Sequence, residues 1–444
     1  MLLKYIVNNY KSIGHAVEFS MFPTEINSDE RFLKTIKTKA GDWKIMHRSG
    51  FFGPNASGKS SFIESLAFAK NFIINGQKSG KGTGVNQFRG KFVDLNGVST
   101  FQFMFYLDDE VYEYGFSLDR HQVHEEWLFI LTENDFVPLF TRVTDAVGKT
   151  QIDIESKFAR KNSKERLLAE ALKEGIQENQ KNQLFLYKLH DNGIKKAENI
   201  VAWFKNLQII FPKTKVKGLP LRLQQDDDFK TFVAESLNKM DTGVFNLSIA
   251  SDEMDFHDFA EKVDLPTEIV EEIEEMKSGI VNLSGKYFIF AEGKKSRTVM
   301  IQIKFEHRLN RKIVSFNIDE ESDGTQRLLD LLPILFAMKD GNRSIYLVDE
   351  IDRSLHTKLS QYLLNEFIGN CDDTYNQIIF TAHDVNLINL DDFRQDEIWF
   401  IEKNNLGESK LKPLSDFNLQ KGQDALKAYL SGRFGAIPMI RREY

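Results

Sequence analysis

Residues 51–60, Phe51-Phe52-Gly53-Pro54-Asn55-Ala56-Ser57-Gly58-Lys59-Ser60, are the most informative stretch of this chain. They match the phosphate-binding loop pattern G-x-x-x-x-G-K-[ST] without a substitution. Glycines at these places let backbone N–H groups surround phosphate oxygens, while the lysine reaches the β- and γ-phosphates and the serine hydroxyl binds Mg²⁺. The pattern therefore predicts a nucleoside triphosphate site, with Ser60 as a metal ligand, formed by Gly53, Pro54, Asn55, Ala56, Ser57, Gly58, Lys59, Ser60 and Ser61.

The residues on both sides of this loop fit the same interpretation. Phe51 and Phe52 are predicted to end a strand, and residues 61–67 are predicted to form a helix. The N-terminus of a helix offers free N–H groups and a positive dipole end to anions. We therefore expect bound phosphates to lie at the start of this helix.

Two later strands are predicted to complete the site. Residues 344–348 form an apolar run that ends in Asp349 and Glu350, which is the Walker B pattern of a buried parallel strand. Asp349 is predicted to hold Mg²⁺, through water, because Mg²⁺ usually keeps several waters. Glu350 is the candidate base that deprotonates the attacking water. His383 follows the apolar run 378–382 and is a candidate γ-phosphate contact, so Lys59, Glu350 and His383 are the predicted catalytic residues.

Composition limits the class of protein. The chain has 444 residues, 41% of them hydrophobic, which predicts a globular protein with more than one domain or a large insertion. Its net charge of −7 gives no general electrostatic reason to bind nucleic acid. A single cysteine, Cys371, excludes an internal disulfide, and no apolar window is long enough to span a membrane. The polar N-terminal segment is unlike a signal peptide, so we expect a cytoplasmic protein with no membrane partner.

Periodicity suggests how the chain is organised. Residues 99–118 alternate apolar and polar around Asp108-Asp109-Glu110, which predicts a β-hairpin. Helical spacing begins near residue 154, for example over 164–178. We therefore expect an α/β fold with three parts: residues 1–153 and 283–444 as the two halves of a nucleotide-binding head, and residues 154–282 as an inserted helical lobe.

The order of the motifs resembles a known family. A phosphate-binding loop, Ser322-Asp323-Gly324-Thr325-Gln326, Asp349-Glu350 and then His383 are similar to the ABC-type ATPase heads of the SMC, RecF and OLD group. The match covers roughly residues 1–130 and 283–444 and is nearest to AAA-family ATPases of prokaryotic anti-phage and abortive-infection systems, the RloA-like group. Residues 429–438 contribute to this resemblance. It implies a P-loop NTPase with a mixed core sheet and an antiparallel β subdomain.

The resemblance also implies partners and further site residues. Heads of this kind close on ATP and Mg²⁺ as a homodimer or a higher oligomer, and each signature meets the ATP of the other copy. Ser322, Asp323, Gly324, Thr325 and Gln326 are then nucleotide-binding residues in trans, and Gln87 is a candidate for the glutamine that links nucleotide to the lobe. OLD relatives have a C-terminal nuclease domain for which this sequence shows no motif. The toxic activity is therefore expected in a separate effector, a nuclease or toxin.

Two other functions remain open from sequence. One is an ATPase of DNA repair or chromosome maintenance that binds nucleic acid, with candidate contacts at Lys157, Arg160, Lys161, Lys164 and Arg166. It predicts affinity that falls steeply with salt. The other is a nucleotide-dependent scaffold with little turnover. Replacing Glu350 by glutamine separates a true ATPase from this scaffold.

Overall fold

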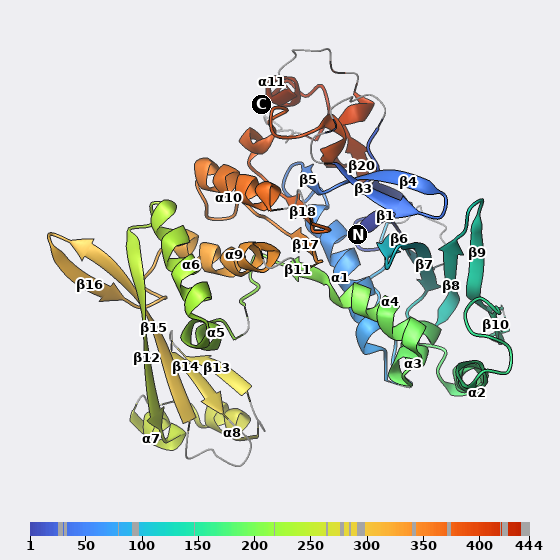
Figure 1. The fold of residues 1–444 in the computed structure, drawn as a ribbon, viewed down its shortest axis with the longest axis horizontal. Coiled ribbons are helices and arrows are strands. Elements are labelled where there is room, and N and C mark those ends of the chain that lie inside the picture. The colour runs from blue at the N-terminus through green and yellow to red at the C-terminus, as the bar shows by residue number, and fades with distance from the viewer. Residues whose placement is uncertain are drawn as a thin grey trace. The chain divides into compact units, whose positions relative to one another are not determined.

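The computed structural model describes residues 1–24, 30, 33–78, 80–90, 97–145, 147–216, 218–262, 265–275, 279–283, 286–290, 298–339, 343–370, 374–417, 419 and 425–436. The chain forms two compact units (Figure 1). Unit 1 contains Met1–Pro212, Gly341–Asp352 and Ser360–Tyr444. Unit 2 contains Lys213–Asp340 and Arg353–Leu359. Unit 2 is therefore an insertion between segments of unit 1.

A six-stranded sheet in unit 1 has the order β11-β17-β18-β5-β19-β20. All neighbouring strands are parallel except the antiparallel pair β19–β20. Strands β5, β17 and β18 are buried along their whole length, as expected for a parallel sheet that is covered on both faces. Their carboxyl ends lie next to one another at one edge of the sheet. The strands are β5 (Arg48–Phe52), β11 (Leu207–Ile210), β17 (Ile345–Val348), β18 (Gln377–Thr381), β19 (Ile398–Lys403) and β20 (Ser409–Pro413).

A second, antiparallel sheet in unit 1 has the order β10-β9-β8-β7-β6-β1-β2. The predicted hairpin is confirmed, because β6 and β7 pair over their whole length around the turn at Asp108 and Asp109. Alternate residues of β6, Phe101, Phe103 and Phe105, are fully buried. The strands are β1 (Leu2–Asn8), β2 (Val17–Ser20), β6 (Ser99–Leu107), β7 (Glu110–Leu118), β8 (Val123–Leu131), β9 (Phe136–Thr144) and β10 (Thr150–Ile154), with a separate hairpin of β3 (Leu33–Thr38) and β4 (Gly41–Met46).

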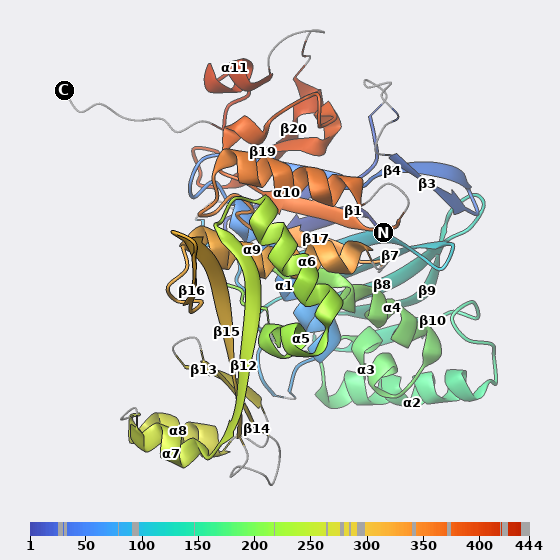
Figure 2. The ribbon, with the colours of Figure 1, turned by 60° about the vertical axis from the view of Figure 1, so that its left-hand side comes forward.

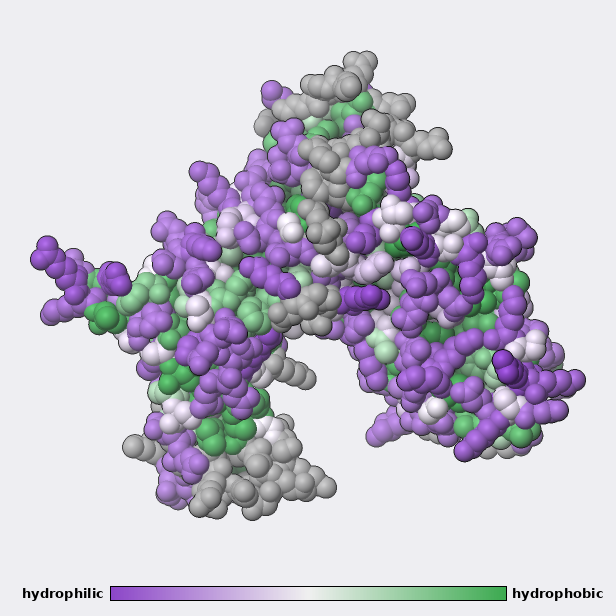
Figure 3. All heavy atoms as spheres, in the orientation of Figure 1, coloured by the Kyte–Doolittle hydropathy of each residue, from purple (hydrophilic) through white to green (hydrophobic). Residues whose placement is uncertain are grey.

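Helix α1 (Lys59–Asn75) lies between these two sheets. The Phe62 ring of α1 is 5.7 Å from Tyr5 on β1 and 4.8 Å from Phe51 on β5, measured between ring centroids. Aromatic pairs of this kind add about 0.5–1.5 kcal/mol each beyond the area they bury. Hydrophilic residues cover most of the visible face of unit 1 (Figure 3). The other helices are α2 (Lys164–Asn179), α3 (Phe185–Asp191), α4 (Lys195–Lys205), most of α10 (Thr357–Gly369), α11 (Ala425–Leu430) and the 3-10 turns η1 (Val385–Leu387), η2 (Gln395–Glu397) and η3 (Leu414–Asp416).

Unit 2 combines a twisted antiparallel sheet with helices. Its strands have the order β12-β15-β14-β13, and β16 also pairs with β15. The long strands β12 and β15 lie side by side in Figure 2. Helix α6 packs on β12 and on α9. The elements are α5 (Leu219–Gln225), α6 (Asp227–Lys239), β12 (Val244–Met254), α7 (Phe256–Lys262), α8 (Thr267–Glu275), β13 (Gly279–Leu283), β14 (Lys286–Phe290), β15 (Thr298–Leu309), β16 (Lys312–Phe316) and α9 (Asp323–Lys339).

The expected helical lobe needs a correction in its content. Residues 154–282 include β11, β12 and β13, so the region is not entirely helical. Their ladders are formed with β17, β15 and β14, two of which lie far away in the sequence, and this pairing is invisible to helical periodicity. The boundaries of the compact units differ from the predicted domain boundaries, because residues 154–212 belong to unit 1 and residues 283–339 to unit 2. The functional division at 153 and 282 remains a prediction.

Candidate nucleotide site

The loop between β5 and α1 has a backbone that requires glycine at two places. Gly53 has a φ of 153°, and a Cβ atom there would lie 2.2 Å from the carbonyl oxygen of Ile401. Gly58 has a φ of 113°, and a Cβ atom would lie 2.0 Å from Oγ of Ser409. The Ser409 hydroxyl donates to the carbonyl of Ser57 at 2.6 Å. The loop is thus held against β19 and β20, which the sequence pattern alone did not indicate.

The Lys59 side chain turns back over this loop and is almost fully buried. Its Nζ donates to the carbonyl oxygens of Gly53 at 2.5 Å and Pro54 at 3.2 Å. It also lies 3.3 Å from Nδ1 of His383. The ammonium group is therefore held beside the backbone that is predicted to bind phosphate, close to a side chain from the end of β18.

The charge of Lys59 is set by burial and by three nearby acids. Burial lowers the pKa of Lys59 to about 8, and the negative charges of Asp352, Asp349 and Glu350 oppose this shift. A buried ammonium loses hydration, whereas anions close to it favour the charged form. Bound phosphate oxygens would favour the charged form further.

Asp349 and Glu350 follow β17 and share one hydroxyl group. Asp349 is 2% exposed, and its Oδ1 accepts a hydrogen bond from Thr381 Oγ1 at 2.7 Å. The same Thr381 oxygen accepts the N–H of Glu350 at 2.8 Å. Burial raises the pKa of the Asp349 carboxyl, while hydrogen bonds from Thr381 and Ser60 lower it. Ser60 and Asp349, the two predicted metal ligands, are therefore in direct contact although 289 positions separate them (349 − 60).

Glu350 and His383 also meet. Nε2 of His383 lies 3.4 Å from Oε1 of Glu350, and both side chains remain partly exposed. Glu350 has a φ of 49°, a conformation that L-residues rarely adopt and that is common at functional sites. The predicted base therefore lies at the edge of the site, where water has access to it.

Asp352 positions the loop that contains His383. Its Oδ2 accepts the backbone N–H of His383 at 2.8 Å and of Asp384 at 2.6 Å. Asp352 and Thr381 are not among the site residues predicted from the motifs. Their signal was their position, directly after Walker B and at the end of the next parallel strand.

The donor set fits Mg²⁺ that is held together with a substrate. Ser60 and Asp349 offer one hydroxyl and one carboxylate. Within the described ranges, no group of three or more His, Cys, Asp or Glu side chains forms a metal cluster. Mg²⁺ is usually bound by one or two protein oxygens plus phosphates and water. The residues present therefore suit this ion better than a metal held by the protein alone.

The signature residues Ser322 to Gln326 lie in unit 2 at the start of α9. Ser322 Oγ accepts the N–H of Thr325 at 3.1 Å, which caps the helix, and Asp323 is the first helical residue. A Cβ atom at Gly324 would lie 2.8 Å from the carbonyl oxygen of Ser354. The side chain of Gln326 donates to the Glu321 carbonyl. The loop is thus ordered by its own contacts, and its role toward a second copy remains a prediction.

Other candidates from the sequence have separate surroundings. Gln87 lines a hollow of about 510 Å³ in unit 1 together with Lys11 and Ser12. Lys157, Arg160, Lys161 and Lys164 are exposed, and Arg166 pairs with Glu170. Cys371, Ile437 and Pro438 lie outside the described residues.

Fold and site together define a P-loop protein of the nucleotide-dependent ATPase class. A parallel sheet carries the glycine loop and the two acids at one edge, and an antiparallel sheet lies on the other side of α1. Residues 49–389 match the family described as "AAA domain, putative AbiEii toxin, Type IV TA system". The chain belongs to this family. The expected α/β class, with a mixed core sheet and an antiparallel β subdomain, is confirmed.

Two solved structures are similar to the chain at low identity. The SMC head domain from Thermotoga maritima is 12% identical, with a TM-score of 0.38, and the alignment covers 93% of this chain and 98% of that one. An SmcHead bound to the C-winged helix domain of ScpA is 13% identical, with a TM-score of 0.44 and coverage of 94% and 99%. No curated protein matches significantly. Among the described residues, no helix is long and apolar enough to cross a membrane.

Proposed function

We propose that this protein is a Mg²⁺-dependent ATPase whose ATP-bound form is a dimer that controls a separate effector in anti-phage defence. The observation that supports hydrolysis is the convergence of Lys59, Ser60, Asp349, Glu350 and His383 at the edge formed by β5, β17 and β18. These residues come from three separate segments of the sequence. A purely structural role would not require a buried lysine, a buried aspartate and a half-buried glutamate at one place.

Each residue has a task that its surroundings support. Lys59 and the loop N–H groups bind the β- and γ-phosphates of ATP, and Ser60 and Asp349 hold Mg²⁺. When bound, Mg²⁺ neutralises charge that develops on the phosphates. Glu350 takes a proton from the attacking water. His383 lies between Glu350 and Lys59. In the proposed mechanism it contacts the γ-phosphate of bound ATP. Thr381 and Asp352 are positioning residues, since they fix the acids and the histidine loop.

The dimer and the effector are inferred from the family and from the motif order. Ser322 to Gln326 meet the nucleotide of a second copy, and closure of the dimer is the signal. The family description names a putative toxin of a toxin–antitoxin system, which supports a role in defence. The separate effector is inferred from the resemblance of the motifs alone. We place the protein in the cytoplasm, where such an effector acts.

Replacement of Glu350 by glutamine tests the proposed hydrolysis. We expect Glu350→Gln to lower ATP turnover by about 10²- to 10⁴-fold, because the base is lost while nucleotide binding is kept. The variant is also expected to accumulate an ATP-bound dimer, measured by light scattering after gel filtration. Glu174→Gln is the matched control, since Glu174 is exposed on α2. An unchanged turnover rate in Glu350→Gln would remove Glu350 from the mechanism.

A second measurement concerns the separate effector. We expect the purified chain alone to leave nucleic acid intact, with or without ATP and Mg²⁺. Cleavage that persists in Lys59→Ala would place a nuclease within the chain and contradict this part of the proposal.

A further inference from the structure

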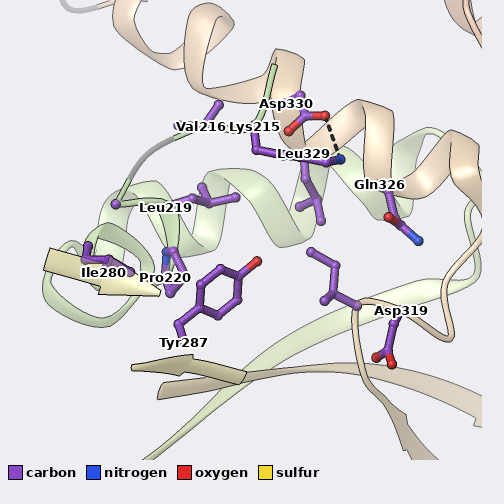
Figure 4. Close-up of a pocket in the computed structure, with 12 residues that line it drawn as sticks. Lys215, Val216, Leu219, Pro220, Ile280, Tyr287, Asp319, Gln326, Leu329 and Asp330 are labelled. Carbon is purple, nitrogen blue, oxygen red and sulfur yellow. Dashed lines mark hydrogen bonds and ion pairs between the residues drawn. The ribbon is translucent and has the colours of Figure 1, made fainter. Parts of the chain in front are cut away.

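Unit 2 contains a cavity of about 590 Å³ that is lined by residues of unit 2 alone (Figure 4). It is bounded by the loop before α5, by α5 and α9, by β13 and β14, and by the loop after β16. Most of its wall is apolar and comes from Val216, Leu219, Pro220, Ile280, Ile318 and Leu329. Pockets of roughly 300–1,000 Å³ with apolar walls and a few polar groups are typical small-molecule sites.

Two acids and one lysine are among the residues that line the cavity. The Asp330 side chain is 5% exposed, and its Oδ2 pairs with Nζ of Lys215 at 3.0 Å. Burial raises the pKa of Asp330, while Lys215, the charge of Arg327 and the backbone N–H of Val216 oppose this shift. Asp319 adds a second carboxylate to the lining. Asp330 is the buried anion of the lining, and Asp319 lies apart from it in Figure 4.

Tyr287 places a hydroxyl group in the same cavity. Figure 4 shows this hydroxyl directed from β14 into the hollow. Within the described part of the chain, it has no hydrogen-bond partner. Tyr287 is only partly buried, so its hydroxyl is accessible from the cavity and not enclosed in the core. The arrangement leaves a polar group available to a bound molecule.

The ion pair at Asp330 is easily exchanged. Lys215 is 66% exposed at its side chain, whereas Asp330 is buried. An exposed ammonium loses little when it returns to water, while a buried carboxylate needs a counter-charge. An amine inside the cavity would meet both the Asp330 carboxylate and an apolar wall. We propose that this cavity binds a small organic amine, with its apolar body among Leu219, Ile318 and Leu329 and its ammonium group on Asp330.

The site also touches the signature segment. Gln326 lines the cavity and belongs to the first turn of α9, four residues before Asp330 on the same helix. A bound amine would therefore contact α9, the helix whose first turn contains the signature residues. An effect of the amine on ATP turnover rests on the proposed function, whereas binding itself does not.

Phenethylamine and 3-phenylpropionate provide a matched pair of probes for the intact protein. Both have one aromatic ring on a short chain, but the first ends in a cation and the second in an anion. We expect phenethylamine to bind saturably, with a Kd of about 1 mM or tighter, measured by calorimetry or ligand-observed NMR. We expect the carboxylate probe to bind at least about tenfold more weakly. Equal binding of the two probes, or no saturable binding of the amine, would overturn the proposal.

Three variants locate the bound probe. Asp330→Asn removes the charge with little change in shape, and Ile318→Trp fills the cavity from a loop position. Both should weaken phenethylamine binding by about tenfold or more. Ile313→Trp is the matched control, because Ile313 is 64% exposed on β16 and does not line the cavity. Thermal unfolding checks that each variant is folded. If a folded Ile318→Trp binds the amine like the original chain, the site is elsewhere. If the amine binds but turnover is unchanged, only the link to the signature fails.

Discussion

At the scale of single residues, Thr381 has two tasks through one oxygen atom. Its hydroxyl donates to Asp349 and accepts the N–H of Glu350, so it fixes both acids after β17. Groups that orient a metal ligand usually change metal affinity or activity when they are removed. Thr381 is the last residue of β18, so its hydrogen bonds connect β18 directly to the acids that follow β17.

Thr381→Val should therefore impair the site without removing a ligand. We expect turnover to fall by about 10- to 100-fold and the Mg²⁺ concentration for half-maximal activity to rise, because Asp349 loses a hydrogen bond. The loss of both bonds should also cost about 1–3 kcal/mol in the free energy of unfolding. Thr141→Val, on β9, is the control. A variant with normal turnover and normal Mg²⁺ dependence would contradict this role.

The pKa of Lys59 leads to a prediction about how nucleotide affinity changes with pH. Its pKa is lowered to about 8, so the free protein loses the ammonium charge as pH rises past that value. Phosphate binds the charged form and raises the pKa, so binding is coupled to proton uptake. We expect affinity for a non-hydrolysable Mg²⁺–ATP analogue to fall between about pH 7 and 9.5.

Calorimetry in two buffers of different ionisation enthalpy measures this coupling. At pH 8 we expect an uptake of about half a proton per site. Lys59→Arg is the control, because a guanidinium stays charged throughout this range and should give weaker, pH-independent binding. Equal affinity of the original chain at both ends of the range would show that Lys59 does not titrate there.

At the scale of elements, sequence patterns within a short window predicted the helices and strands whose formation depends on nearby residues. β17 and β18 were predicted because each is a short apolar run, and α2 because its spacing is helical. β12 was missed although its first half alternates, with Phe245, Leu247 and Ile249 on one face, because its second half, residues 250–254, is mostly polar. Its ladder with β15 joins residues about 50 positions apart, and pairing at that distance has no signature in a short window.

The candidate site shows the same division. The motif residues Lys59, Asp349 and Glu350 were identifiable because their chemistry fixes their types and spacing. Thr381 and Asp352 were not, because threonine and aspartate are common at strand ends and in turns. Because β17 and β18 are adjacent in the sheet, Thr381 reaches Asp349 and Asp352 reaches the backbone of His383.

At the scale of the whole molecule, the proposed function requires residues from both compact units for each ATP site, and the second unit comes from another copy of the chain. The phosphate-binding loop belongs to unit 1, and the signature segment belongs to unit 2. If each ATP lies between the loop of one copy and the signature of another, a symmetric dimer has two equivalent sites. Every site then takes residues from both chains.

Mixing two inactive variants tests this arrangement directly. Lys59→Ala removes the phosphate lysine, and Ser322→Arg blocks the signature, so each variant alone should be inactive. In a mixed dimer one site combines both defects, while the other combines an intact loop with an intact signature. Random pairing makes half of the dimers mixed, so we expect about one quarter of the original ATPase rate. Two different affinity tags show that mixed dimers form. If mixed dimers form and no activity returns, either loop and signature act within one chain or a dimer needs two intact sites. A mixture of Lys59→Ala with the original chain separates these two explanations. If a dimer needs two intact sites, the mixed dimers of that second mixture are inactive as well.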